Sequence, residues 1–255
     1  MSESIRAVDR ALDVLLCFSA NTPVLSMTQI SEIVGMNKST VHRLLATLEA
    51  KRFVQRDPLT GLYQPGNRLL QMAFLTTQKN NLFEVVEPYM KKLNELYRET
   101  ITLSILDDSD VVYSSVVESQ QTVKLAAKPG QRLPAFCTAS GKVLMAYSDE
   151  ETIQKIFDQG FPEYTSFTIR SSETLIHIFR LVRERGFAYS EQEYEEGINA
   201  VAAPIIDRNK RPLAAIAVAG PAYRLTLERM LEIGPSVAET AREAIRDLEL
   251  RVNVK

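Results

Sequence analysis

The sequence predicts an α+β protein made of two units, a small helical unit followed by a larger unit with an antiparallel sheet. At 255 residues the chain is longer than one typical domain. Its pattern changes near residue 100, from helical spacing to β-branched runs separated by turns. Residues 1–79 hold nine Lys or Arg against six Asp or Glu, whereas residues 80–255 hold 21 against 26. A basic first unit suggests a polyanionic partner.

The overall composition is that of a soluble globular protein, with 45% hydrophobic and 24% charged residues. No apolar run reaches the roughly 18–20 residues that span a bilayer, and the N-terminus does not resemble a secretion signal. We therefore expect a cytoplasmic protein with no membrane partner. Cys17 and Cys137 each lie beside a phenylalanine, which favours buried, reduced thiols over a disulfide or a metal site.

Three helices are predicted in the first 50 residues. Over residues 5–18 apolar side chains recur at three- and four-residue spacing, which is typical of an amphipathic helix: Val8, Ala11, Leu12, Leu15 and Phe18. Ser26 is placed to cap a second helix over residues 27–34, which Gly35 would end. A third helix follows over residues 37–50, with one apolar face of Val41, Leu44, Leu45 and Leu48.

A hairpin is predicted directly after the third helix. The segment FVQRDPLTGLYQ has two short β-type runs around Pro58 and Gly61, which is turn chemistry between paired strands. Three helices and this hairpin predict a winged helix-turn-helix domain over residues 1–66. Residues 67–81 are predicted to be a helical linker, and residues 82–255 the second domain.

The second domain combines strands and helices without regular alternation. After a helical pattern over residues 85–97, strands are predicted at 101–107 and 111–118. Helices follow at 139–147, 150–159 and 173–185, then strands at 200–206 and 213–219, and a last helix from 226 to about 251. This order favours an α+β domain with an antiparallel sheet.

The polar face of the third helix fits double-stranded DNA. A helix-turn-helix places its second helix in the major groove, where Arg43 can bind guanine through two hydrogen bonds and His42 can reach a base edge or a phosphate. Taken alone, this face would be an ordinary solvated surface. The capped short helix, the glycine turn and the basic hairpin favour DNA binding, with these predicted contacts: Ser26, Lys38, Ser39, Thr40, His42, Arg43 and Arg56.

Both halves of the chain carry a resemblance to a known family. SIRAVDRALDVLLCFS, LSMTQISEIVGMNKSTVHRLLATLEAKRFVQRD and GLYQPGNRLLQMA resemble the winged helix-turn-helix half of the IclR family of bacterial transcription regulators. GFAYSEQEYEEGINAVAAPIID is similar to that family's C-terminal signature, including Gly186, Ser190 and Glu193. One position departs, because Ile206 stands where the signature has an aromatic residue or histidine. The resemblance covers nearly the whole chain.

The resemblance implies a GAF-like effector domain over residues 82–255, which binds a small metabolite and alters operator binding, as in a repressor of a metabolic operon. It also implies a dimer formed through the N-terminal part, or a tetramer. Because one winged helix-turn-helix covers few base pairs, we expect a pseudo-palindromic operator. Val8, Leu12, Leu15 and the linker helix offer a surface for the dimer.

Carried over by position, the resemblance also implies an effector site. Ala139 and Ser140 would lie at a helix start, Ser190 and Ile198 in a loop, and Ala200, Ala217 and Ala219 on the floor, with Leu125 nearby. Backbone N–H groups at Ser140 and Gly141 could hold a carboxylate, and Thr138 could add a hydroxyl, although an ordinary capped helix start remains the alternative. The alanine floor favours an acid with an aromatic or aliphatic body.

An enzyme is the rival class, with Cys137 as nucleophile and His177 as base. We find no nucleophile-elbow, phosphate-loop or dinucleotide-binding motif to support it, and we expect His177 at the surface or the edge of the core. A DNA-architectural protein would be far more basic. The acidic run EQEYEEG is expected to be a solvated loop, so we predict no metal site. We likewise predict no enzyme activity and no cofactor.

Overall fold

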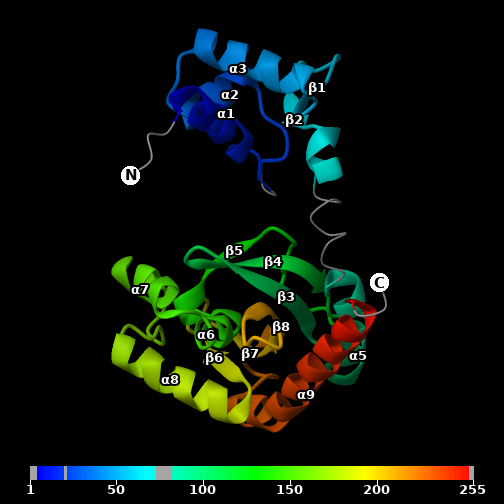
Figure 1. Cartoon of the computed structure of the whole chain (residues 1–255), viewed down its shortest axis with the longest axis vertical. Helices are drawn as coiled ribbons and strands as arrows, with labels where there is room; N and C mark the ends of the chain where they lie inside the picture. Colours follow the sequence, from blue (N-terminus) through cyan, green and yellow to red (C-terminus); the bar gives the residue numbers. More distant parts are fainter. Residues whose placement is uncertain (1–4, 20–21, 73–81, 253–255) are drawn as a thin grey trace. The chain divides into compact units, whose positions relative to one another are not determined.

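The structure is a computed structural model that describes residues 5–19, 22–72 and 82–252. It divides into two compact units, residues 1–80 and 81–255, each of which is described by itself (Figure 1). Residues 67–72 are helical, and the rest of the predicted linker lies outside the described residues. The finer domain boundaries, at residues 66 and 82, stay predictions. No helix in the described part of the chain is long and apolar enough to cross a membrane.

The N-terminal unit contains the three predicted helices, α1 (Arg6–Leu16), α2 (Met27–Ile33) and α3 (Lys38–Ala50). They enclose a small core in which Val14, Ile30 and Leu45 are fully buried. Val8 and Leu12 of α1 are exposed, as the predicted dimer surface requires, whereas Leu15 is half-buried against the core. Val14, which the apolar spacing did not include, is fully buried. Val14 lies on a different side of the helix from Val8 and Leu12, so α1 has an apolar face that its own unit does not cover.

A short hairpin completes this unit, as predicted. β1 (Val54–Arg56) pairs antiparallel with β2 (Tyr63–Pro65), and Gly61 at the turn has a φ of 70°. This left-handed conformation is one that glycine adopts without steric cost. A single bridge from Leu25 to Tyr63 joins the chain before α2 to the hairpin, a pairing that the sequence pattern did not reveal.

The C-terminal unit is built on a six-stranded antiparallel sheet with strand order β5-β4-β3-β8-β7-β6. The strands are β3 (Thr100–Asp107), β4 (Asp110–Val117), β5 (Arg132–Pro134), β6 (Ala188–Glu191), β7 (Ile198–Ile206) and β8 (Pro212–Pro221). Chain neighbours β3 and β4 form one hairpin, and β7 and β8 another, and β3 pairs with β8 at the centre. The predicted α+β class is confirmed.

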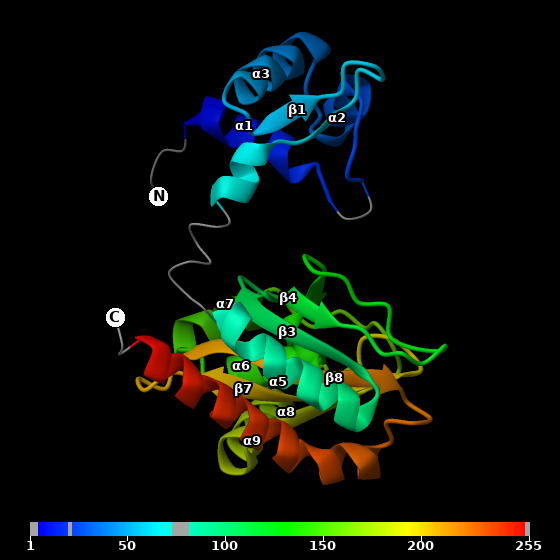
Figure 2. The same ribbon diagram turned by 90° about the vertical axis from the view of Figure 1, so that its right-hand side faces the viewer.

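Helices cover both faces of this sheet (Figures 1 and 2). α5 (Leu82–Tyr97) and α9 (Leu227–Val252) pack on one face, against side chains such as Ile216 and Val218. α6 (Ala139–Met145) and α8 (Ser172–Arg185) pack on the other, with α7 (Glu150–Asp158) at its edge. Because side chains alternate along a strand, Ala215 and Ala217 of β8 face α6 while their neighbours face α9.

Three short elements were not predicted: β5, β6 and the 3-10 turn η1 (Ala135–Cys137). None is longer than four residues, so none shows a repeated apolar spacing. They matter for the site, because β6 carries Ser190 and η1 leads into α6. Ser190 therefore lies on an edge strand and Ile198 begins β7, which corrects the expectation that both lie in a loop.

Candidate functional site

The polar face of α3 presents the predicted DNA-contacting side chains to solvent. Lys38, Ser39, His42 and Arg43 are exposed, because the opposite face of the helix is buried through Val41, Leu45 and Leu48. Thr40 is half-buried. The four exposed residues occupy the first two turns of the helix, which is the part that reaches base edges in a helix-turn-helix.

Asn37 fixes the start of this helix, a role that the sequence analysis did not assign. Its side-chain oxygen accepts hydrogen bonds from the Thr40 N–H, at 2.9 Å, and from the Ser39 hydroxyl, at 2.8 Å. The cap therefore holds Ser39 in one orientation at the N-terminal end of α3. An asparagine directly before a helical pattern is a recognisable capping signal.

Ser26 is confirmed as a helix cap, in a reciprocal pair with Gln29. Its hydroxyl accepts from the Gln29 N–H at 3.3 Å, so a contact to DNA would have to share that group. Arg56 of β1 donates from Nε to the Gly61 carbonyl at 3.1 Å, and its guanidinium lies 5.6 Å from the centre of the Tyr63 ring. The wing thus holds Arg56 against its own hairpin.

The turn of the wing is stabilised by Asp57. Its carboxylate accepts from the backbone N–H groups of Thr60, at 2.8 Å, and Leu59, at 2.9 Å. These bonds, first of all the one from Thr60, lower the pKa of Asp57 from its usual value. The carboxylate stays ionised at neutral pH, and it orders the loop between the two strands.

The C-terminal unit contains a cavity of about 60 Å³ between the sheet and the start of α6. Nine of the ten residues predicted to bind the effector line it: Leu125, Thr138, Ala139, Ser140, Ser190, Ile198, Ala200, Ala217 and Ala219. These residues come from segments that lie far apart in the sequence, and the fold brings them to one place. Their role in binding stays a prediction.

Small side chains on the sheet create the space for this cavity. Ala200 of β7 pairs with Ala219 of β8, and Ala202 pairs with Ala217. Each of these positions points to the α6 face, where larger side chains would fill the gap between sheet and helix. The alanine floor proposed from the sequence is therefore a continuous patch across two central strands.

Gly141 is the predicted site residue that does not line the cavity. Its N–H donates to the Thr138 hydroxyl at 3.1 Å, so the helix cap uses the group that we expected to hold a carboxylate. The lack of a side chain is what this position requires, because a Cβ on Gly141 would lie 2.0 Å from the Ala135 carbonyl oxygen. Gly141 thus lets η1 pack closely on α6.

Hydroxyl groups supply most of the polarity inside the cavity. Among the described residues, the Thr102, Tyr113 and Tyr194 hydroxyls line it and have no hydrogen-bond partner. Burial raises the pKa of Tyr113, so its phenol remains a proton donor at physiological pH. The described lining contains no Lys, Arg or His, and its one charged residue is Glu195. A bound anion would be held by neutral donors.

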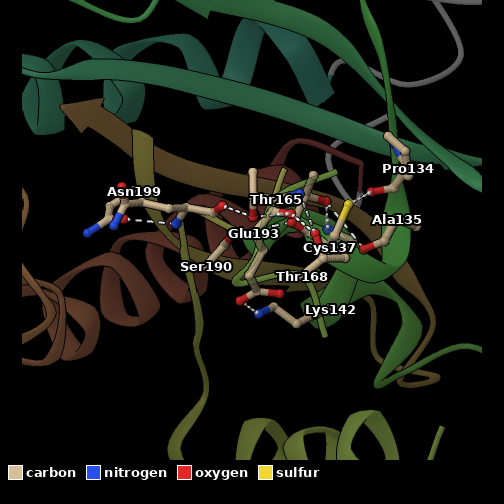
Figure 3. Close-up of polar contacts among 12 residues, drawn as sticks. Pro134, Ala135, Cys137, Lys142, Thr165, Thr168, Ser190, Glu193 and Asn199 are labelled. Atoms are coloured by element: carbon tan, nitrogen blue, oxygen red, sulfur yellow. Dashed lines mark hydrogen bonds and ion pairs between the residues drawn. The ribbon is translucent and has the colours of Figure 1, made fainter. Parts of the chain in front are cut away.

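The acidic run EQEYEEG is only partly solvated, which corrects the expectation from the sequence. Glu195 and Glu196 are exposed, but Glu193 is 4% exposed and forms an ion pair with Lys142 of α6, Oε1 to Nζ at 2.5 Å (Figure 3). Burial raises the pKa of Glu193, and the Lys142 ammonium opposes this effect. Lys142 lies in the helix that was predicted over residues 139–147, but the sequence pattern did not indicate that its side chain is buried.

The two residues of the alternative enzyme site have opposite environments. Cys137 is fully buried and lines the cavity, whereas His177 is exposed on α8. Burial, with a contribution from Glu193, raises the pKa of the Cys137 thiol to about 12. Only the thiolate is a good nucleophile, so this environment opposes the chemistry that the enzyme hypothesis needs. Cys17 is also buried, and both cysteines are free, as predicted.

Comparison with known proteins gives two family matches in the predicted order. Residues 7–58 match the IclR helix-turn-helix domain, and residues 74–246 match the bacterial transcriptional regulator IclR C-terminal domain. The chain is 31% identical to the regulator XynR of Escherichia coli, over 84% of this chain and 85% of that protein. It is 28% identical to the transcriptional repressor IclR of the same species, over 94% and 88%.

Solved structures agree with these matches. The IclR transcriptional regulator from Alicyclobacillus acidocaldarius is 26% identical, with a TM-score of 0.82 over 96% of this chain and 99% of that one. An IclR homologue from Microbacterium hydrocarbonoxydans, solved with 4-hydroxybenzoate, has a TM-score of 0.83 over 94% and 99%, and at 21% identity it shows the shared fold. The chain thus belongs to the IclR family of bacterial transcriptional regulators.

Proposed function

We propose that a small carboxylic acid binds the cavity of the C-terminal unit and changes the affinity of the N-terminal unit for an operator. The observation that carries this proposal is the cavity itself, whose lining combines unpartnered hydroxyl donors with an alanine floor. The polar face of α3, on which Arg43 and His42 are exposed, supplies the side chains that contact the bases of double-stranded DNA. We take repression as the mode of action, since it is the mode named for the relative IclR.

The donors support an acid that is recognised without a cation. Tyr113 and Thr102 can each donate one hydrogen bond to a carboxylate, and Tyr194 can donate a third. The cavity of about 60 Å³ is smaller than the roughly 150 Å³ engineered cavity that holds benzene. An acid with an aromatic body, as the sequence led us to expect, therefore requires part of the wall to move.

We also propose that the protein acts in the cytoplasm as a dimer, or a dimer of dimers, on a pseudo-palindromic operator. One observation and one general argument support this idea. Ile5, Val8, Leu12 and Leu16 form an exposed apolar stripe on α1, with exposed fractions of 51–79%. A second copy would double the number of base pairs that α3 can read.

The proposal includes no catalytic role for Cys137 or any other residue. The raised pKa of Cys137 and the exposed position of His177 are its support. A regulator must release its effector unchanged, whereas an enzyme would convert it.

A ligand screen that includes a turnover assay tests the effector and the absence of catalysis together. Glycolate, branched aliphatic acids, benzoates and hydroxylated acids would be added to the full-length protein while its melting temperature is recorded. A ligand present at about 100 times its Kd should stabilise the protein by about 2.7 kcal/mol. We expect stabilisation by at least one acid, recovered chemically unchanged. Conversion of that acid would support the enzyme alternative, and stabilisation by none would contradict the proposed effector class.

A further inference from the structure

Lys142 and Glu193 form an ion pair that is almost completely removed from water. Their side chains are 2% and 5% exposed, and the second carboxylate oxygen of Glu193 has no hydrogen-bond partner within the described chain. Removing two charges from water is costly, and such a pair is often no more stabilising than two apolar side chains of the same size. Its presence therefore calls for a role other than stability.

The two partners belong to two different elements that line the cavity. Ala139 and Ser140, at the start of α6, line it, and Lys142 follows on the same helix. Tyr194 and Glu195 line it from the segment that joins β6 to β7, directly after Glu193, and Ile198 lines it as the first residue of β7. The ion pair thus connects the helix wall to the segment wall, and neither Lys142 nor Glu193 itself lines the cavity.

Other bonds hold the same segment at its N-terminal end (Figure 3). The Thr165 and Thr168 hydroxyls donate to the carbonyls of Gln192 and Glu193, each at 2.7 Å. Gln192 has a φ of 53°, a conformation that few side chains adopt, and its N–H donates to the Asn199 side chain at 3.0 Å. Residues 194–198 therefore extend from a fixed point at Glu193.

We propose that Lys142 and Glu193 are positioning residues that hold segment 192–198 against α6 and so limit the size of the acid that the cavity admits. This inference rests on the proposed function, since it concerns the same cavity. With the pair intact, the cavity keeps its volume of about 60 Å³, well below the roughly 150 Å³ of an engineered cavity that holds benzene. With the pair removed, Tyr194 and Glu195 can move outward and make room for a larger body.

The test compares the full-length protein with the double variant Lys142→Met/Glu193→Met. Two methionines have nearly the same volume as the original pair and leave no charge unpaired, so the fold is expected to persist. The matched control is Glu151→Met/Lys155→Met, which removes an ion pair of the same type on α7 whose side chains are 79% and 64% exposed. Amide hydrogen exchange reports on the segment, and calorimetric titration with glycolate and benzoate reports on the cavity.

For the double variant we expect exchange at residues 192–197 to rise at least tenfold while β7 and β8 keep their protection. The ratio of benzoate to glycolate affinity should rise at least tenfold. The control should change neither quantity. Unchanged exchange in the segment, or faster exchange across the whole unit, would overturn the proposal. So would an unchanged affinity ratio. A double variant that binds neither acid would also overturn it, because release of the segment should admit benzoate.

The unmodified protein provides a second test, which does not depend on the folding of a variant. Segment 192–198 has no regular secondary structure before Ile198, yet the proposal requires it to exchange as slowly as the flanking strands β6 and β7. Exchange as fast as that of the exposed turn at residues 208–210 would overturn it. Neither exchange measurement involves DNA or a ligand, so failure here is distinct from failure of the proposed function, which operator binding tests.

Discussion

Replacing Gly141 with alanine should destabilise the C-terminal unit, although alanine is the better helix former. In an open helix position the change from glycine to alanine favours folding by about 1 kcal/mol. Here the new Cβ would lie 2.0 Å from the Ala135 carbonyl oxygen and 2.4 Å from its Cα. Cβ atoms do not approach other atoms within 3.0 Å, so η1 and α6 would have to separate by at least 1 Å. Both elements are buried backbone and cannot give way as a flexible side chain could.

Overpacking of a buried site costs about 1–3 kcal/mol, and a clash with backbone should lie at or above the top of that range. For a unit of this size, about 3 kcal/mol lowers the melting temperature by about 6–12 °C. Tyrosine near-UV circular dichroism is the suitable assay, because eight of the nine tyrosines lie in residues 81–255 and the chain has no tryptophan. The signal therefore follows the unit that carries the change.

Gly160→Ala is the control for this experiment. Gly160 has a φ of 77°, and a Cβ there would meet no atom within 4 Å. Its replacement should cost only about 1 kcal/mol, from backbone strain alone. A Gly141→Ala protein that melts at the same or a higher temperature than the original would refute the close approach of η1 and α6, and with it the described shape of the cavity wall.

Three further predictions concern helix α3 and the buried thiol. Arg43→Ala should weaken binding to the specific site by about 1–3 kcal/mol and reduce the preference for one base there. Lys38→Ala should weaken binding to all DNA sequences alike and lower the slope of log affinity against log salt concentration by about one. Fluorescence anisotropy measures both, and an equal loss of affinity for random DNA in Arg43→Ala would contradict the base-reading role. Asn37→Ala should lower the stability of the N-terminal unit by about 0.5–2 kcal/mol through loss of the cap, which far-UV melting would detect, while an unchanged melt would argue against that cap. In a Cys17→Ser protein, iodoacetamide should alkylate Cys137 at pH 8 about a thousandfold more slowly than a thiol of pKa 9, since its pKa of about 12 leaves little thiolate, and rapid alkylation would contradict its burial.

Much of the fold follows from local sequence. The helical spacing in α1 to α3 and the turn at Asp57 to Gly61 predicted the winged helix-turn-helix, because each signal lies within one element. The β-branched runs likewise predicted β3 and β4. Strand order was out of reach, since β3 pairs with β8 more than a hundred residues later, and only the closed three-dimensional packing selects that partner.

The site shows where sequence reasoning stops. The resemblance named eight residues that line the cavity, and the helix-start argument added Thr138. For Gly141 that argument suggested a donor, whereas the structure requires the absence of a side chain. Glu193 was read as solvated because three further glutamates surround it, and no local pattern marks the one that turns inward to Lys142. Which of several equivalent charges is buried depends on a partner 51 residues away.

Occupation of the cavity should change operator binding, and a titration of the operator with and without the acid tests this coupling. Labelled operator DNA, obtained by selection with the full-length protein, would be titrated with and without an acid found in the melting screen. The same titration would use Ala217→Leu, which fills the alanine floor and should leave the N-terminal unit untouched. We predict at least a fivefold change in Kd for the original protein and no change for Ala217→Leu. An operator affinity that stays constant when the acid is bound would contradict the proposed coupling between the cavity and operator binding.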